Sequence, residues 1–551
     1  MKKFIPVLYT AALVAFSISC QQEVVDHSAS PCPSDDPSII CPQAEAVACP
    51  PGASAGSADF TKFVAMGSSY TAGFQAGALF NEGQANSLPK ILAAQFSCVG
   101  GGAFNQPDIG SENGYNIFVS PNPVVSGNTI TTYGRFKLQG TPPKPTPVLA
   151  GNEAIPNPSL NPSFMFAGNK AALNNFAVQA TLLAQTLSTA TGNWANPNPA
   201  AGFSPFYARF ASNPGSSTIL GDAVSAAPTF FMFWAGMDDY LLYAAYGGDQ
   251  TKAPLTPVGG GVGVGFAATY QYILGTILGS NPALKGVIAN FPSVFALPHF
   301  RSVPYNPLPL AEAQASAANT GFAGYNQVIE ALKGPPFNYP AADVNARKIS
   351  FTAGNNPFVI VDETLNDYGD EFDGLQNAGA ITAEQRAALV PYEQVRQTTA
   401  GDIIPLAAGS VLGTLADPAN PASVRGIGVP LEDRYALIPS EIAAIEEARI
   451  AYNSAIADVA AANSTRVALA DVNAAFTAFL TNKAAIGNNI TLTPNINPPT
   501  GIYSEDGMHP NSRGYAFIAN IFIDAINAKF GASVPKVNYA NYGATALPIN
   551  P

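Results

Sequence analysis

Five short and almost wholly apolar segments constrain the fold of this chain more than any other feature of its sequence. Each has the length of a β-strand, and stretches with helical periodicity separate them. Strands buried on both faces have this composition, so the pattern predicts an α/β fold with a five-stranded parallel sheet between helices. The five segments are residues 63–66, 174–178, 229–235, 286–291 and 466–472.

The intervening segments predict helices and two long insertions. Apolar residues at helical spacing predict helices over 87–96, 180–187 and 268–278, and a longer helix that begins at Ser440 as N-cap. Regions rich in Gly, Pro and Asn, or too long for one crossover, predict insertions. The insertions are expected at about residues 97–170, with a β-like piece at 127–138, and at 293–465, with a further strand at 357–362.

The composition limits the classes of partner. The chain of 551 residues has a net charge of −12, only 11% charged residues, 49 Gly and 48 Pro. Nucleic acid is not an expected partner, because no basic patch is present to neutralise phosphates. We expect a neutral, turn-rich surface and neutral or apolar substrates.

The first twenty residues have the pattern of an export signal. Lys2 and Lys3 precede the apolar run 4–16, and small residues lead to Cys20. This pattern resembles a bacterial lipoprotein processing site, although Ser17 stands where such sites usually carry leucine. The resemblance implies a lipid anchor at Cys20 and an outer-membrane location, on its periplasmic or surface face. Secretion with a free Cys20 is the alternative.

Composition also suggests the domain boundaries. A Pro/Ser-rich tether is expected at 21–58, a domain with insertions at 59–535 and a C-terminal tail at 536–551. Four cysteines remain after Cys20, and an even number in an exported protein suggests two disulfides with three possible pairings. These cysteines are Cys32, Cys41, Cys49 and Cys98.

No pattern typical of a metal site is present, and we expect no metal or cofactor. The cysteines lack Cys-x-x-Cys spacing and have no histidine near them that would favour zinc. The acidic run from Asp362 to Asp373, which includes Glu363, lacks EF-hand spacing, and we interpret it as a solvated face, with calcium binding as the alternative.

The first apolar segment ends in a group of hydroxyl residues. Gly67 permits a sharp turn, and Ser68 and Ser69 follow it. A strand that turns here into a helix leaves a hydroxyl at the carboxyl end of the sheet, beside a helix N-terminus that favours negative charge. Two roles remain open on this segment alone, a nucleophile or a helix cap.

A second polar group lies near the C-terminus. Asp506 stands three residues before His509, and this spacing allows the carboxylate to reach Nδ1 and leave Nε2 free to accept a proton from a serine. The chain has only two other histidines. His27 lies in the expected tether, and His299 follows the fourth apolar segment, where we expect a packing role.

Ser69 at the end of the first strand, combined with Asp506 and His509, resembles the SGNH or GDSL hydrolase superfamily. Gly67-Ser68-Ser69 matches the family's Gly-Asp-Ser, with Ser68 in the place of an aspartate outside the catalytic set. The resemblance implies a three-layer, flavodoxin-like α/β/α domain. It also implies Ser69 as nucleophile, His509 as base and Asp506 as the residue that orients His509.

Two further blocks of this family supply the oxyanion hole, and both depart from the pattern here. Ala180 stands in the place of a glycine that offers its backbone N–H, which alanine also has. In Gly236-Met237-Asp238-Asp239, Asp238 stands in the place of an asparagine that donates an N–H. Ionised Asp238 would repel the oxyanion, whereas a protonated Asp238 near Trp234 and Tyr240 would donate.

The sequence therefore predicts an exported, lipid-anchored esterase or lipase that cleaves esters of lipids or acylated carbohydrates. The oxyanion would bind the N–H groups of Ser69 and Ala180, with Asp238. Apolar residues of the insertions are candidates for an acyl site, although core packing explains them equally well; they are Phe80, Phe104, Phe118 and Phe300. The alternative is a non-catalytic or weakly active surface lipoprotein that binds glycan, lipid or protein through its insertions.

Overall fold

The computed structural model describes residues 47, 49–119, 124–126, 129–140, 144–150 and 155–545. All of these residues belong to one compact unit. The expected signal segment, Cys20, most of the tether, Cys32 and Cys41 lie outside the described residues. Of the possible disulfides, Cys49–Cys98 is present, and it links the start of the described chain to the segment after α3 (Leu88–Phe96).

A four-stranded parallel sheet forms the centre of the fold, in the order β1-β5-β6-β11. In register, Phe63 pairs with Phe230 and Gly67 with Trp234, while Val467 pairs with Gly286. Nearly every residue of these strands is buried, which explains why their sequences are continuous apolar runs. The strands are β1 (Phe63–Gly67), β5 (Phe230–Trp234), β6 (Lys285–Ala289) and β11 (Val467–Ala470).

The prediction of five strands is wrong by one. Residues 174–178 run along the free edge of β1 and form one parallel bridge, Ala65 to Asn175. Backbone hydrogen bonds join Ala65 to Asn174 and Phe176, but the Asn174 side chain donates to the Phe63 carbonyl, 2.8 Å away. Because the Asn174 side chain occupies the Phe63 carbonyl, the hydrogen-bonded ladder between this segment and β1 does not extend to Phe63.

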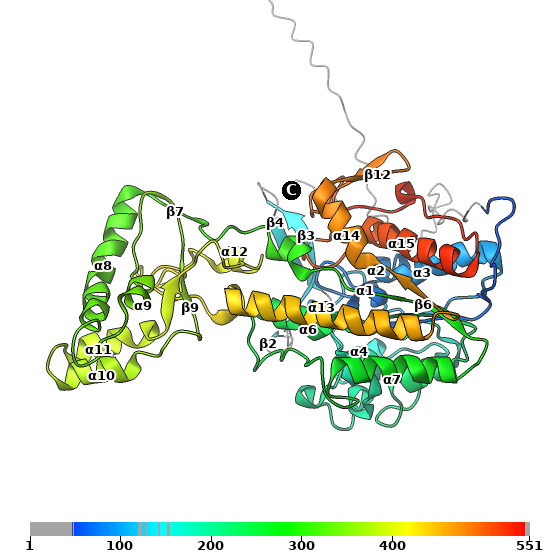
Figure 1. The fold of residues 1–551 in the computed structure, drawn as a ribbon, viewed down its shortest axis with the longest axis horizontal. Helices are drawn as coiled ribbons and strands as arrows, with labels where there is room; N and C mark the ends of the chain where they lie inside the picture. The colour runs from blue at the N-terminus through cyan, green and yellow to red at the C-terminus, as the bar shows by residue number, and fades with distance from the viewer. Residues whose placement is uncertain are drawn as a thin grey trace, which may run out of the picture. The chain divides into compact units, whose positions relative to one another are not determined.

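Two groups of helices flank the sheet (Figure 1). In one group α15 packs on β11, β6 and α3; in the other, α13 packs on α6 and α7, and α5 contacts β1. The side chain of Asn511 caps α15 by accepting from Gly514 N–H. The helices are α15 (Ser512–Phe530), α13 (Pro439–Ala462), α7 (Phe266–Gly279), α6 (Asp238–Ala245), α5 (Ile219–Ser225) and α14 (Val472–Asn482).

The four helix predictions compare as follows. The predicted helices at 87–96 and 268–278 correspond to α3 and α7. The long helix is present as α13, but its N-cap is Ile438 and not Ser440, and the Glu441 side chain accepts from the Ile438 N–H. At 180–187 only a 3-10 helix forms, over Leu183–Leu187, because Ala180 has a positive φ of 50° that an α-helix does not contain.

The first insertion contains a small antiparallel sheet, and shorter helices precede and follow it. Strand β3 covers most of the β-like piece expected at 127–138. The elements are α1 (Ser69–Ala72), α2 (Asn81–Ala85), β2 (Val124–Ser126), β3 (Thr129–Gln139), β4 (Lys144–Ala150) and α4 (Pro205–Ala208). Near the C-terminus, β12 (Ala485–Gly487) pairs with β13 (Ile490–Leu492).

The second insertion has apolar clusters of its own. Two groups of buried residues, one around Tyr325 and Phe351 and one around Phe358 and Leu431, are separate from the core around the sheet. The strand predicted at 357–362 is present as β9. The elements are β7 (Leu308–Leu310), α8 (Glu312–Ala331), α9 (Ala341–Ala346), β8 (Gly354–Asn356), β9 (Val359–Val361), α10 (Gly369–Asn377), α11 (Ala383–Leu389), β10 (Val395–Gln397) and α12 (Ala408–Val411).

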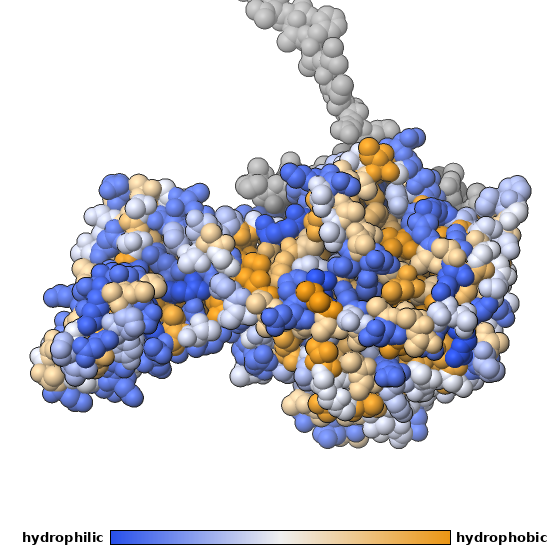
Figure 2. All heavy atoms as spheres, in the orientation of Figure 1, coloured by the Kyte–Doolittle hydropathy of each residue, from blue (hydrophilic) through white to orange (hydrophobic). Residues whose placement is uncertain are grey.

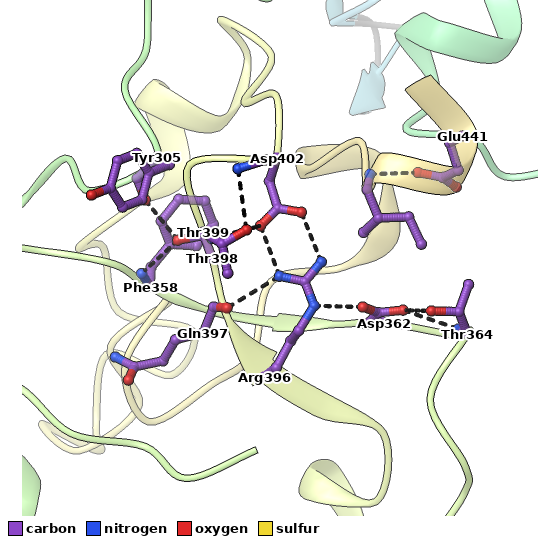
Figure 3. Close-up of polar contacts among 12 residues, drawn as sticks. Tyr305, Phe358, Asp362, Thr364, Arg396, Gln397, Thr398, Thr399, Asp402 and Glu441 are labelled. Carbon is purple, nitrogen blue, oxygen red and sulfur yellow. Dashed lines mark hydrogen bonds and ion pairs between the residues drawn. The ribbon is translucent and has the colours of Figure 1, made fainter. Parts of the chain in front are cut away.

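An ion-pair network joins β9, β10 and the following turn (Figure 3). Arg396 binds Asp362 through Nε at 2.5 Å and Asp402 through both terminal nitrogens at 2.7 Å. All three side chains are buried. Removal of one partner would leave a buried charge uncompensated, so the network fixes these segments relative to one another.

The described surface agrees with the neutral composition. Apolar and polar residues are mixed over the face that Figure 2 shows. No helix among the described residues is both long enough and apolar enough to cross a bilayer.

Candidate active site

Ser69 lies where β1 passes into a helix. It is the first residue of α1 and is buried at the carboxyl end of the sheet. Gly67 is required at this turn, because a Cβ there would lie 2.2 Å from Thr71 Oγ1 and 2.6 Å from the Trp234 carbonyl oxygen. Ser68 is the N-cap residue, yet its side chain forms no cap hydrogen bond with α1. The helix-cap role is therefore not observed for either serine.

Asp506 and His509 lie together in the loop before α15. The Nδ1 atom of His509 is 2.9 Å from Asp506 Oδ2, and Asp506 Oδ1 accepts from the backbone N–H groups of Met508 and His509 at 2.8 Å. Burial alone would raise the pKa of Asp506. The charge of His509 and these hydrogen bonds outweigh that effect and lower the pKa to about 2, so Asp506 is ionised at neutral pH.

The other ring nitrogen of His509 has no partner. Nε2 is fully buried and forms no hydrogen bond, although such atoms are nearly always paired. The rings of Tyr70 and Phe74 pack against the imidazole, at centroid distances of 5.3 and 4.8 Å. The Tyr70 hydroxyl donates to the Met508 carbonyl at 2.5 Å. These contacts fix the ring and leave Nε2 available to a reacting group.

Ser69, Ala180 and Asp238 meet at the side chain of the serine. The Ala180 N–H donates to Ser69 Oγ at 3.0 Å, and Ser69 Oγ donates to Asp238 Oδ2 at 3.3 Å. The Thr181 N–H also donates to Asp238 Oδ2, at 3.2 Å. The structure thus brings together all the residues expected in the oxyanion hole.

Asp238 has an unusual electrostatic environment. Burial raises the pKa of its carboxyl group, and the charge of His509 and hydrogen bonds from its neighbours oppose this shift only in part. The neighbouring Asp239 is also buried, and burial raises its pKa to about 7. Asp239 binds Thr256 Oγ1 and the Leu183 N–H, so it has a structural role.

A narrow cavity joins these groups. It is lined by Ser69, Ala180, Asp238 and His509, and its walls are apolar. Its volume accessible to water is about 10 Å³, which is room for a single water molecule. The apolar wall residues are Phe74, Ile117, Phe118, Leu241, Leu242, Ala245 and Met508.

The sequence did not indicate most of the residues that line the cavity or that donate hydrogen bonds to Asp506. Phe118 was named as a candidate and lines the cavity, but Phe80, Phe104 and Phe300 do not and are buried elsewhere. Asp506 Oδ2 also accepts from the Gly77 N–H at 2.9 Å, and Oδ1 accepts from the Ser504 hydroxyl at 3.1 Å. Apolar walls and backbone donors carry no signal that distinguishes them from ordinary core and turn residues.

His299 supports the loop that carries Asp506 and His509. Its Nδ1 lies 3.1 Å from the Asp506 carbonyl oxygen, and its backbone N–H donates to the Gly507 carbonyl at 2.9 Å. Burial lowers the pKa of His299 to about 4. The imidazole is therefore neutral at pH 7, in agreement with the packing role that the sequence suggested.

The cavity offers no ligand set typical of a metal. Among the described residues, one group of three acidic side chains has ligand atoms within 4.8 Å of one another, and none of its members lines the cavity. Searches of protein-family models, curated proteins and solved structures found no match to this chain.

Proposed function

We propose that this protein is a serine hydrolase that cleaves carboxylic esters with Ser69, His509 and Asp506. The observation that carries the proposal is the buried, unpaired Nε2 of His509, which shares a cavity with Ser69 while Asp506 holds Nδ1. A buried acceptor without a partner is costly to maintain, and a role in proton transfer explains it. On this proposal the domain is an SGNH-type, three-layer, flavodoxin-like fold.

The reaction would proceed through an acyl-enzyme. Ser69 Oγ attacks the acyl carbonyl and passes its proton to His509 Nε2, and the tetrahedral intermediate then expels the alcohol, which takes that proton. Water, activated by His509, hydrolyses the Ser69 ester and restores the free hydroxyl. Asp506 remains ionised and stabilises the imidazolium that forms in each half-reaction.

The developing oxyanion would bind at the end of α1. As the first residue of that helix, Ser69 has a backbone N–H without an intrahelical partner, and the Ala180 N–H already points at Ser69 Oγ. When the serine attacks, both N–H groups can turn to the substrate oxygen. Asp238 contributes a third donor when its carboxyl is protonated.

The apolar walls favour an acyl chain as the group that enters the cavity. We propose an ester of a lipid or an acylated carbohydrate, cleaved without a cofactor. Because the cavity has room for only about one water molecule, Phe74, Ile117 or Phe118 must move before an acyl chain can bind. A lipid anchor at Cys20 would hold the enzyme at the outer membrane.

One observation favours the alternative of a non-catalytic lipoprotein that binds glycan, lipid or protein. The Ser69 hydroxyl is bonded to Asp238, and among the described residues no hydrogen bond joins it to His509. Loose nucleophile–base geometry is common before substrate binds, so this observation does not outweigh the unpaired Nε2.

A fluorophosphonate probe and short-chain aryl esters test the proposal. The wild-type protein should become labelled and hydrolyse the esters, whereas Ser69→Ala should do neither. Ser68→Ala is the matched control for labelling, since the hydroxyl of this buried neighbour bonds Asp238 and does not line the cavity; this variant should still be labelled. Hydrolysis that survives Ser69→Ala, or wild-type protein that is not labelled, would exclude the enzyme.

A further inference from the structure

Three carboxylates from distant parts of the chain converge outside the active site. Glu363 follows β9, Asp433 begins a short 3-10 helix and Glu441 lies in the first turn of α13. One ligand oxygen from each lies within 4.8 Å of those of the other two. The three residues join the second insertion to a helix that packs against the central fold.

No basic side chain compensates this group. Within the part of the chain that the structure describes, no Lys, Arg or His forms an ion pair with any of the three. The cation of the neighbouring network, Arg396, is already bound by Asp362 and Asp402 (Figure 3). Three carboxylates at such short range repel one another unless a proton or a cation lies between them. Burial and the charges of Asp433 and Glu363 raise the pKa of Glu441 to about 9, so in the absence of a cation its carboxyl holds a proton.

Glu441 supplies an independent observation. Its side chain is 5% exposed, and Oε2 accepts from the Ile438 N–H at 2.9 Å. Oε1 is buried, and no described N–H or hydroxyl group donates to it; in the absence of a cation a proton shared with Glu363 would have to satisfy it. Gly248 packs directly on it, since a Cβ at this glycine would lie 1.7 Å from Oε1. A buried carboxylate oxygen without a donor is rare, and a bound cation would satisfy it.

We propose that Glu363, Asp433 and Glu441 bind one calcium ion, which fastens the second insertion to the start of α13. Carboxylate oxygens are the ligands of hard cations, and oxygens on one calcium ion lie up to about 5 Å apart, a wider spread than magnesium accepts. The exposed Glu363 gives the ion access from solvent, and water completes the coordination. The site is separate from the proposed hydrolysis, in which the ion takes no part.

Calorimetric titration of the full chain, after removal of metals with EDTA, tests the site. Calcium added up to about 10 mM covers the weak affinities that are typical of extracellular calcium modules. We expect one saturable calcium ion per chain and a rise in the melting temperature. Glu363→Gln and Asp433→Asn should each weaken binding at least about tenfold, by loss of a charged ligand.

The control is Glu432→Gln, which changes the residue beside Asp433. Glu432 pairs with Arg434 and lies outside the group, so calcium binding should be unchanged. The absence of saturable binding in the wild-type protein, or undiminished binding in the Glu363→Gln and Asp433→Asn double variant, would overturn the proposal. Tighter binding of magnesium than of calcium would overturn the assignment to calcium.

Discussion

Ser69 Oγ donates to Asp238 Oδ2 across 3.3 Å, at the position where an oxyanion would have to bind. The Ala180 N–H holds the same hydroxyl at 3.0 Å. The hydroxyl thus occupies the proposed oxyanion hole while Nε2 of His509 stays unpaired in the same cavity. For attack, the side chain of Ser69 must rotate toward His509, and this rotation frees the Ala180 N–H and Asp238 for the substrate oxygen.

Asp238→Asn should increase the rate of ester hydrolysis at pH values above the pKa of Asp238. Burial raises the pKa of Asp238, so its carboxyl donates at low pH and loses its proton as the pH rises through that pKa. Asparagine donates at every pH and keeps an oxygen that accepts from the Thr181 N–H. One oxyanion donor changes rates by a factor on the order of a hundred. We therefore expect the kcat of the wild type to decline as the pH rises through the pKa of Asp238, on the alkaline side of the profile, and Asp238→Asn to remove this alkaline decline.

The control for this comparison is Asp239→Asn, which neutralises the adjacent buried carboxyl outside the cavity lining. This variant should retain the alkaline decline. A kcat of Asp238→Asn below that of the wild type over the whole pH range would show instead that the carboxyl group itself is needed.

Much of this site was predictable because its signals are local. Asp506 and His509 are three residues apart, and Ser69 ends an apolar run, so short patterns identify both. Ala180 is different, since nothing in an alanine indicates that its φ is positive. Residues 174–178 are predicted as a strand from their local composition. The hydrogen bond of the Asn174 side chain to β1 arises from tertiary packing, so the local sequence does not indicate it. Long-range groups such as Glu363, Asp433 and Glu441 have no sequence signal for the same reason.

The backbone conformation of Ala180 predicts that glycine and valine at this position differ in their effects on stability and activity. Its φ of 50° is a conformation that glycine adopts freely and that costs other residues about 1 kcal/mol. Ala180→Gly should keep the N–H in place, retain ester hydrolysis and change the free energy of unfolding by less than about 1 kcal/mol. Ala180→Val should lower both stability and kcat, because a β-branched residue resists positive φ. Equal activity of the two variants would show that this backbone geometry does not matter.

The neutral state of buried His299 predicts that the free energy of unfolding decreases as the pH falls from about 6.5 to about 4. Its pKa is about 4 in the folded protein and about 6.5 when unfolded, so below pH 6.5 the unfolded chain binds a proton that the folded chain does not. The free energy of unfolding should therefore decrease as the pH falls from 6.5 to 4, by about 3 kcal/mol from this group. His299→Gln should remove this part of the pH dependence. Urea unfolding at pH 7 and pH 4.5 measures it, and an identical pH dependence in both proteins would contradict it.

Phe118 predicts how the site discriminates between acyl chains. It lines the cavity, packs edge-on against Phe74 with ring centroids 6.2 Å apart, and is 36% exposed, so it can move without leaving a void in the core. Phe118→Ala should widen the entrance to the cavity. Because the wild-type cavity has room for only about one water molecule, this change should raise kcat/KM for long-chain aryl esters several-fold. Acetyl esters need less room and should change little. Tyr272→Ala, which truncates an exposed aromatic residue of α7 outside the cavity lining, is the matched control. Equal changes for short and long esters would place the acyl chain away from Phe118.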